Sequence, residues 1–275
     1  MKRATVGKPP DTGGDAAVLR RWIIEQCRDA NVGHLGSALS IVEMLAVLWG
    51  DVMHRPGTDD PTRDRFILGK GHAALALYAV MRLHGLIDEA TYRTYCQDDS
   101  LLGVHPEHGL PGVEVTTGSL GQGLSVGCGQ AIALAKRGSK ARVFVLVSDG
   151  ECNEGQVWEA AMLAAHHRLK NLIVMVDDNG SQAFGAARDV IDMSPMSERW
   201  RAFGWHAVEA DGHDVSALRD ALTTAIDART GPAVVIAKTV LGKGVSYMEG
   251  RLEWHYRNLT PALAAQALAE VEASL

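Results

Sequence analysis

The residues best suited to chemistry lie at the ends of two apolar runs within positions 142–181. The first run ends in Ser148-Asp149-Gly150 and the second in Asp177-Asp178-Asn179-Gly180-Ser181. The acidic turn and helical stretch between them are typical of a β-α-β unit, whose parallel strands end at one ligand-binding edge. Carboxylate and carboxamide oxygens suit Mg²⁺ or Ca²⁺, and Mg²⁺ commonly links protein carboxylates to phosphates. We therefore expect a metal–diphosphate site built around Asp149 and Asn179.

The strands and helices that must position this site follow from the apolar pattern. Further strands are predicted at 65–68, 205–209 and 232–239. Helices are predicted at 16–29, 38–49, 73–84, 124–136, 197–203, 215–229 and 261–274, the last two capped by Asp214 and Thr260. This alternation indicates an α/β fold: a single doubly wound domain with a mainly parallel sheet flanked by helices. We expect residues 15–275 to form the domain and residues 1–14 to be a flexible lead-in.

Composition excludes several classes of protein. The chain has 275 residues, 47% of them hydrophobic, and a net charge of −6, which gives no reason to expect a nucleic-acid partner. No apolar run approaches the roughly 20 residues of a membrane helix, and the N-terminal segment lacks the apolar core of a secretory signal. The four cysteines form no CxxC pair, so we expect reduced thiols and a cytoplasmic location.

Residues 102–129 differ in kind, because they contain eight glycines and two prolines. This density is too high for a packed helix and too patterned for disorder. We interpret the stretch as a binding loop that runs into a helix of small residues. Its 118–123 core, Gly-Ser-Leu-Gly-Gln-Gly, would allow the backbone to approach a ligand or a partner helix closely.

Six motifs occur in an order that resembles one known family. They are GHLGSALS at 33–40, KGHAALALYA at 70–79, GVHPE at 103–107, PGVEVTTGSLGQGLSVGCGQA at 111–131, SDGECNEGQVWEAA at 148–161 and KTVLGKGVSYME at 238–249. Together they resemble the N-terminal, diphosphate-binding half of transketolase, a thiamine-diphosphate enzyme, over about residues 16–260. Transketolases usually carry two further domains in the same polypeptide. The chain therefore resembles one subunit of a split, two-chain transketolase.

The resemblance implies how the metal is held. Asp149, Asn179 and the backbone carbonyl of Ser181 would bind Mg²⁺, for which Ca²⁺ or Mn²⁺ could substitute, and the ion would clamp two diphosphate oxygens. The structural alternative is that the side chains of Asp149 and Asn179 only cap turns. Ser148 departs from the family, which usually has glycine there, so its hydroxyl would either crowd the diphosphate turn or add a hydrogen bond.

The resemblance also implies which residues line the cofactor. Gly150 and Glu151 would present backbone N–H groups to phosphate oxygens, as helix N-termini do. Gly118, Leu120 and Gly121 would contact the thiamine, although small residues also serve where helices cross closely.

Four histidines would form the catalytic set by the same resemblance. His34, His72 and His105 each lie in a loop flanked by glycine or proline. They would point into the substrate channel, bind hydroxyl groups and exchange protons, and His72 would also contact the diphosphate. His255 would match the family's late histidine and reach both substrate and diphosphate. Its surroundings, WHYRNLT at 254–260, depart from the usual WHG-type sequence.

The remaining expectations concern partners. Glu154 and Glu159 would lie at a subunit interface in a proton network, or else on a solvated helix face. Lys238 and Lys243 could attract a phosphate or be surface charges.

The resemblance implies a C-terminal partner chain with the pyrimidine-binding domain, in an α₂β₂ assembly that transfers a two-carbon ketol unit between sugars or sugar phosphates. Two alternatives are the α-subunit of a 2-oxoacid dehydrogenase and a non-catalytic cofactor-binding subunit. Substrates of the pentose phosphate route are the default, and a specialised sugar pathway is the other possibility.

Overall fold

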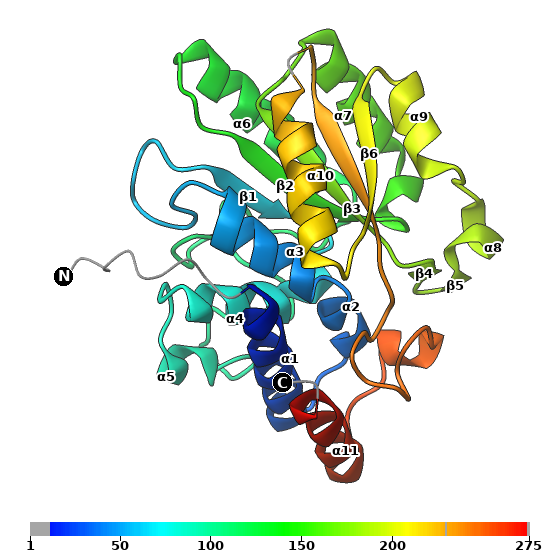
Figure 1. Ribbon diagram of the computed structural model, residues 1–275. Coiled ribbons are helices and arrows are strands. Elements are labelled where there is room, and N and C mark those ends of the chain that lie inside the picture. The colour runs from blue at the N-terminus through cyan, green and yellow to red at the C-terminus, as the bar shows by residue number, and fades with distance from the viewer. Residues whose placement is uncertain (1–11, 229, 274–275) are drawn as a thin grey trace.

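The core of the protein is a five-stranded parallel sheet (Figure 1). The computed structural model describes residues 12–228 and 230–273. The strands occur in the order β1 (Arg65–Leu68), β2 (Val143–Ser148), β3 (Leu172–Asp178), β7 (Ala233–Lys238) and β6 (His206–Asp211). Every neighbouring pair is parallel. The predicted doubly wound α/β fold is therefore confirmed.

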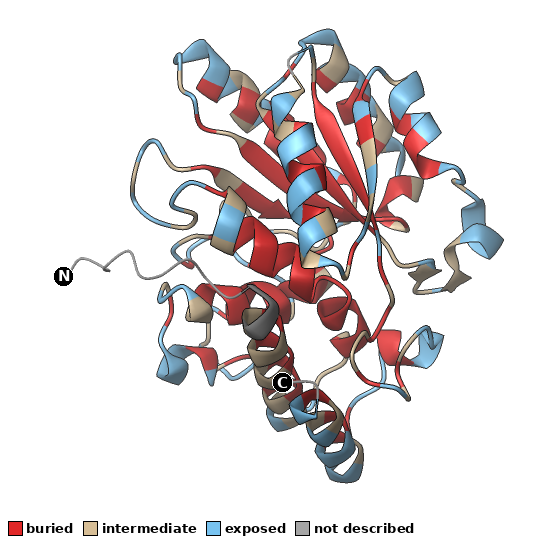
Figure 2. Ribbon diagram, in the orientation of Figure 1, coloured by how far each residue is buried: buried red, intermediate tan, exposed pale blue. Residues whose placement is uncertain are grey.

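Helices cover both faces of the sheet, and the strand residues alternate between two apolar cores. On one face, Phe144 and Leu146 pack with α1 (Thr12–Ala30), α3 (Val42–Val47), α4 (Ala74–Leu83), α10 (Val215–Asp227) and α11 (Pro261–Glu272). On the other, Val143 and Val145 pack with α6 (Gln122–Lys136), α7 (Gly155–His166) and α9 (Met196–Ala202). Figure 2 shows the strands buried between these two layers. Both faces are covered, as parallel sheets require.

Several predicted elements have different ends. Positions 38–49 are not one helix: α2 (Leu35–Leu39), α3 and a π-turn (Leu48–Val52) replace it. The break falls at Ser40, whose hydroxyl turns inward to the carbonyl of Ser37 and to Asp177. Helix α1 begins at Thr12, inside the expected lead-in. The rest of that lead-in, positions 1–11, lies outside the described residues. The same holds for positions 229 and 274, the predicted ends of α10 and α11. Asp214 and Thr260 cap α10 and α11 as predicted.

The predicted loop at 182–195 contains secondary structure of its own. Strands β4 (Ser181–Gln182) and β5 (Gly185–Ala186) form a small antiparallel ribbon, and α8 (Ala187–Ile191) follows it. A further short helix, α5 (Glu89–Tyr92), has no counterpart in the sequence prediction. No described helix is long and apolar enough to cross a membrane.

Candidate functional site

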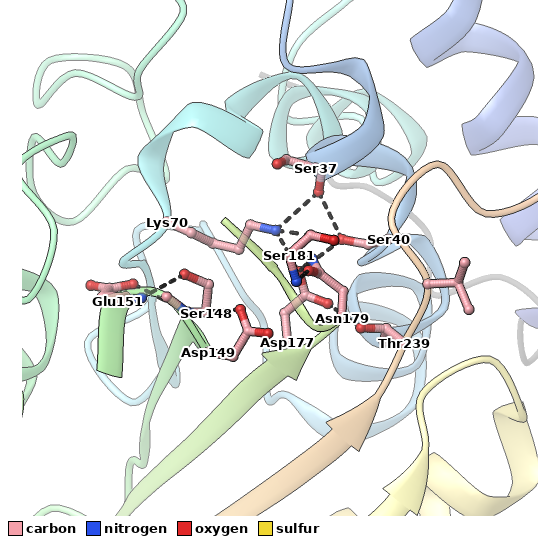
Figure 3. Close-up of polar contacts among 12 residues, drawn as sticks. Ser37, Ser40, Lys70, Ser148, Asp149, Glu151, Asp177, Asn179, Ser181 and Thr239 are labelled. Carbon is pink, nitrogen blue, oxygen red and sulfur yellow. Dashed lines mark hydrogen bonds and ion pairs between the residues drawn. The ribbon is translucent and has the colours of Figure 1, made fainter. Parts of the chain in front are cut away.

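The carboxyl ends of β2 and β3 meet at one edge of the sheet, as the sequence predicts (Figure 3). Each oxygen of the Asp149 carboxylate accepts a backbone N–H at 2.7 Å, one from Gly150 and one from Gly180. The side-chain oxygen of Asn179 accepts the N–H of Ser181 at 2.9 Å. The three predicted metal ligands therefore belong to one hydrogen-bonded unit.

Asp149 is a buried carboxylate without a cationic partner. Its neighbours Asp177 and Asp178 pair with Lys70 and Lys238, but no ion pair between described residues includes Asp149. Burial, followed by the charge of Asp177, raises the pKa of Asp149 to about 7. Its oxygens retain lone pairs, because a carboxylate can accept about four hydrogen bonds. The site therefore fits a divalent cation, which would supply the missing positive charge.

This donor set is one that a search for clustered acids would miss. Among the described residues, no group of three or more His, Cys, Asp or Glu side chains has the geometry of a metal site. The predicted set consists of one carboxylate, one amide oxygen and one backbone carbonyl. These hard oxygen ligands suit Mg²⁺ or Ca²⁺ better than a softer ion.

A pocket of about 570 Å³ opens beside the unit and collects most of the predicted site residues. Those that line it are His34, His72, His105, His255, Gly118, Leu120, Gly150, Glu154, Asn179 and Ser181. Asp149 lines an adjoining pocket of the same volume, together with Met193 and Lys238. Gly121, Glu151 and Glu159 line neither pocket. The structure thus brings together the four histidines and two of the three predicted metal ligands in one cavity.

Three of the histidines form a compact group. The ring centroids of His34, His72 and His255 lie 5.3–5.6 Å apart. Burial, then the charges of neighbouring histidines and Lys70, lowers the pKa of His34 and lowers that of His255 to about 4. Burial and Lys70 lower the pKa of His72 to about 2. In the chain by itself these rings are therefore neutral at neutral pH.

The backbone holds two of these rings in place. The N–H of His34 donates to the carbonyl of His255 at 3.1 Å, and His34 has φ +66°, a conformation that non-glycine residues adopt rarely. Such strain often occurs at functional sites. His105 packs against Gly118, where an added Cβ would lie 3.1 Å from the imidazole. Gly118 also has φ +149°, so a larger residue would be both strained and crowded.

The side chain of Glu151 contacts the rest of the protein, not the open pocket. It is fully buried, and its two oxygens accept the N–H groups of Gly121 at 2.9 Å and Ser148 at 3.3 Å. Its own N–H donates to the Ser148 hydroxyl at 3.0 Å. The hydroxyl of Ser148, at the position where the family usually has glycine, therefore accepts a hydrogen bond within this turn. Burial raises the pKa of Glu151 to about 7.

Several residues around this site were not predicted from the sequence. Lys70 and Asp177 form a buried ion pair at the same sheet edge. The carbonyl of Ser37 accepts from Lys70, and the hydroxyls of Ser40 and Thr239 donate to Asp177. The sequence signal for this pair was a lysine two residues after a mostly buried strand. Tyr256 also lines the pocket, with its ring 5.1 Å from His34 and 4.8 Å from His255. The unusual WHYRNLT sequence therefore places an aromatic ring beside the histidines.

Helix α7 presents an exposed face next to the pocket. Glu154 and Glu159 are exposed there, and Met162 and Leu163 on the same helix are 54% and 44% exposed. Large apolar side chains at this exposure are consistent with a surface that another chain covers.

Comparisons with known proteins decide the family. Residues 15–271 match the family described as transketolase, thiamine diphosphate binding domain. The chain belongs to the transketolase family. It is 38% identical to a 6-deoxy-6-sulfo-D-fructose transketolase subunit of a Clostridium species, covering 95% of this chain and 96% of that one. It is 41% identical to one of the subunits of the apulose-4-phosphate transketolase of Actinobacillus succinogenes, covering 88% of each.

Solved transketolases have the same fold. The transketolase of Campylobacter jejuni superposes with a TM-score of 0.87 at 30% identity, covering 95% of this chain but 42% of that one. The human transketolase is 38% identical in sequence over 92% of this chain and 41% of its own length. The chain is thus the N-terminal, thiamine-diphosphate-binding domain of a transketolase, and it spans about two fifths of these longer relatives. The recognition made from six motifs is confirmed.

Proposed function

We propose that this chain is the cofactor-binding subunit of a two-chain transketolase. Together with a partner chain that carries the pyrimidine-binding domain, it would transfer a two-carbon ketol unit from a ketose to an aldose. The observation that carries the proposal is the buried carboxylate of Asp149, which pairs with no described cationic side chain and lies beside a pocket lined by four histidines. An α₂β₂ assembly in the cytoplasm is the proposed form, supported by relatives that are named as subunits and by four free cysteines.

The residues of this chain would divide the work as follows. Asp149, the side-chain oxygen of Asn179 and the carbonyl of Ser181 would hold Mg²⁺, and Gly150 would face the diphosphate. Thiamine diphosphate supplies, when bound, the nucleophilic carbon that cleaves and forms the C–C bond. Gly118 and Leu120 would border its ring system.

The histidines would handle the sugar. His34, His72, His105 and His255 lie in one cavity and are able to donate to or accept from hydroxyl groups. For His34, His72 and His255, the lowered pKa leaves one acceptor nitrogen on each neutral ring of the free chain. Such a ring can accept a hydrogen bond from a substrate hydroxyl, and an anionic cofactor bound beside it would raise its pKa toward the range in which it can take and return the proton. His255 is buried and His34 and His72 are half-buried, and a partner chain that covers the pocket would limit the access of water to them further.

The substrate is a narrower proposal. Two relatives that match over most of their length act, by name, on 6-deoxy-6-sulfo-D-fructose and on apulose 4-phosphate. We therefore favour a specialised sugar over the pentose phosphate route. In the described residues of the pocket the only lysine, Lys70, is already paired with Asp177, so the partner chain would bind the anionic end of the sugar.

The test compares the purified chain with and without its cognate partner. We expect ketol transfer only from the mixture, and only with Mg²⁺ and thiamine diphosphate. Robust transfer by the lone chain would refute the two-chain proposal. Cofactor binding without any transfer by the mixture would instead favour the non-catalytic subunit.

A further inference from the structure

The sheet edge contains an ion pair that the metal ligands alone do not require. Lys70, in the turn after β1, and Asp177, near the end of β3, pair with 1% and 0% of their side chains exposed (Figure 3). Lys70 also donates to the carbonyl of Ser37 at 3.1 Å. Removing one member of a buried pair is strongly destabilising, whereas replacing both members by apolar residues is often neutral. Stability alone therefore gives little reason for such a pair.

The contacts of Asp177 reach a predicted metal ligand. Its Oδ2 accepts from Lys70, from the Ser40 hydroxyl at 2.7 Å and from the side-chain nitrogen of Asn179 at 3.0 Å. Its Oδ1 accepts from the hydroxyl of Thr239. A carboxylate only accepts hydrogen bonds, so the group of Asn179 that faces Asp177 must be the NH₂. The amide oxygen of Asn179 must then face the opposite way, toward Ser181.

We propose that Asp177, held by Lys70, is a positioning residue that orients the amide of Asn179. It would present oxygen and not NH₂ to the cation. This inference rests on the proposed function, because it assigns a role within the proposed metal site. Groups behind metal ligands commonly fix their orientation in this way.

Lys70 has a second part in this arrangement. Asp149, Asp177 and Asp178 lie close together, and three unpaired carboxylates would repel one another. Lys70 neutralises Asp177, and Lys238 neutralises Asp178. Asp149 is left as the carboxylate available to the cation.

The test uses two double variants that both remove the charged pair. Lys70→Met with Asp177→Asn retains an oxygen that can accept from Asn179, whereas Lys70→Met with Asp177→Leu does not. Each chain is purified with its partner, and Mg²⁺ affinity is measured by calorimetry at saturating thiamine diphosphate. The Asn variant should bind Mg²⁺ within about threefold of wild type, and the Leu variant about 10–100-fold more weakly. Thermal unfolding without metal serves as the structural readout.

Arg142→Met with Asp64→Asn is the matched control, because it removes an ion pair with a buried carboxylate directly before β2 and β1, at the opposite end of the sheet. It should lower the unfolding temperature and leave Mg²⁺ affinity unchanged. Equal Mg²⁺ affinity of the two double variants would overturn the inference, as would an affinity loss that merely follows the loss of stability. A wild-type complex that binds thiamine diphosphate without any metal would overturn the proposed function itself, so the two failures are distinguishable.

Discussion

The backbone N–H of His34 donates to the carbonyl of His255 at 3.1 Å, which joins two loops from opposite ends of the sequence. The same contact brings both imidazoles against His72, with ring centroids 5.3 Å from each. The group is therefore assembled by the fold and exists before any ligand binds. Among the described residues, no carboxylate contacts these three rings and would hold a proton on them.

Replacing His72 should impair the reaction more than the fold. His72→Gln keeps a polar side chain but removes the imidazole, so kcat/KM for ketol transfer by the two-chain enzyme should fall about 10²–10⁴-fold. His206→Gln, at the exposed start of β6, is the control and should leave the rate unchanged. Steady-state kinetics with circular dichroism as a check on folding would measure both. A fall below tenfold for His72→Gln would exclude a role in proton transfer.

The stability of the metal-free chain should depend on Asp149 and on pH. The folded pKa of about 7 lies above the ordinary value of 3.8, so the folded state binds the proton more tightly. Stability from this group is present below about pH 4 and is lost as the pH rises through about 7, by at most about 4 kcal/mol. Asp149→Asn should therefore flatten the decrease in stability between about pH 4 and pH 7.

Urea unfolding at several pH values, with and without Mg²⁺ and thiamine diphosphate, measures this effect. Cofactor should restore the stability of wild type at high pH, since it stabilises the ionised carboxylate, and should not restore that of the variant. An unchanged pH dependence in Asp149→Asn would contradict the assignment of this carboxylate.

The sequence predicted the strand ends well and the buried polar contacts poorly. Asp149 and Asn179 follow long apolar runs, so their place at one sheet edge could be inferred from periodicity. The helix predicted at 38–49 was wrong as a single element, because the inward hydroxyl of Ser40 bonds to Asp177 from a distant strand. Such a contact leaves no periodic signal. The contact of the Glu151 carboxylate, which accepts the N–H of Gly121, was not predicted for the same reason.

Glu43 should control stability on the acid side. Burial would raise its pKa, but the hydrogen bond from His213 and the charge of Arg20 outweigh burial and lower the pKa to about 2. Stability from Glu43 is present above about pH 4.5 and is lost as the pH falls toward 2, by up to about 3 kcal/mol. Glu43→Gln should remove this acid-side loss and destabilise the chain at neutral pH by about 3–5 kcal/mol, because Arg20 stays buried without its partner.

Chemical denaturation from about pH 2 to pH 7 would measure the effect of Glu43. Glu253→Gln is the control, because its pair with Arg257 is about half exposed and contributes at most about 1 kcal/mol. The buried network of Arg20, Glu43 and His213 also holds the loop after β7, since His213 Nε2 accepts the N–H of Val240 at 2.9 Å. If both substitutions change stability equally, the buried network has no special role.

Two glycines of one segment should respond to alanine in opposite directions. Gly121 has φ +88°, and an added Cβ would lie 2.8 Å from Gln156 Cγ and 2.9 Å from Glu154 Cβ. Gly121→Ala should therefore cost about 1–3 kcal/mol and should weaken cofactor binding, because it displaces the N–H that Glu151 accepts. Gly129 lies within α6 with no atom near its added Cβ. Gly129→Ala should stabilise the lone chain by about 0.5–1 kcal/mol, because alanine loses less conformational freedom on folding. Thermal unfolding of both variants measures the difference, and destabilisation of similar size in the two would show that the Gly121 turn is not under the constraint described.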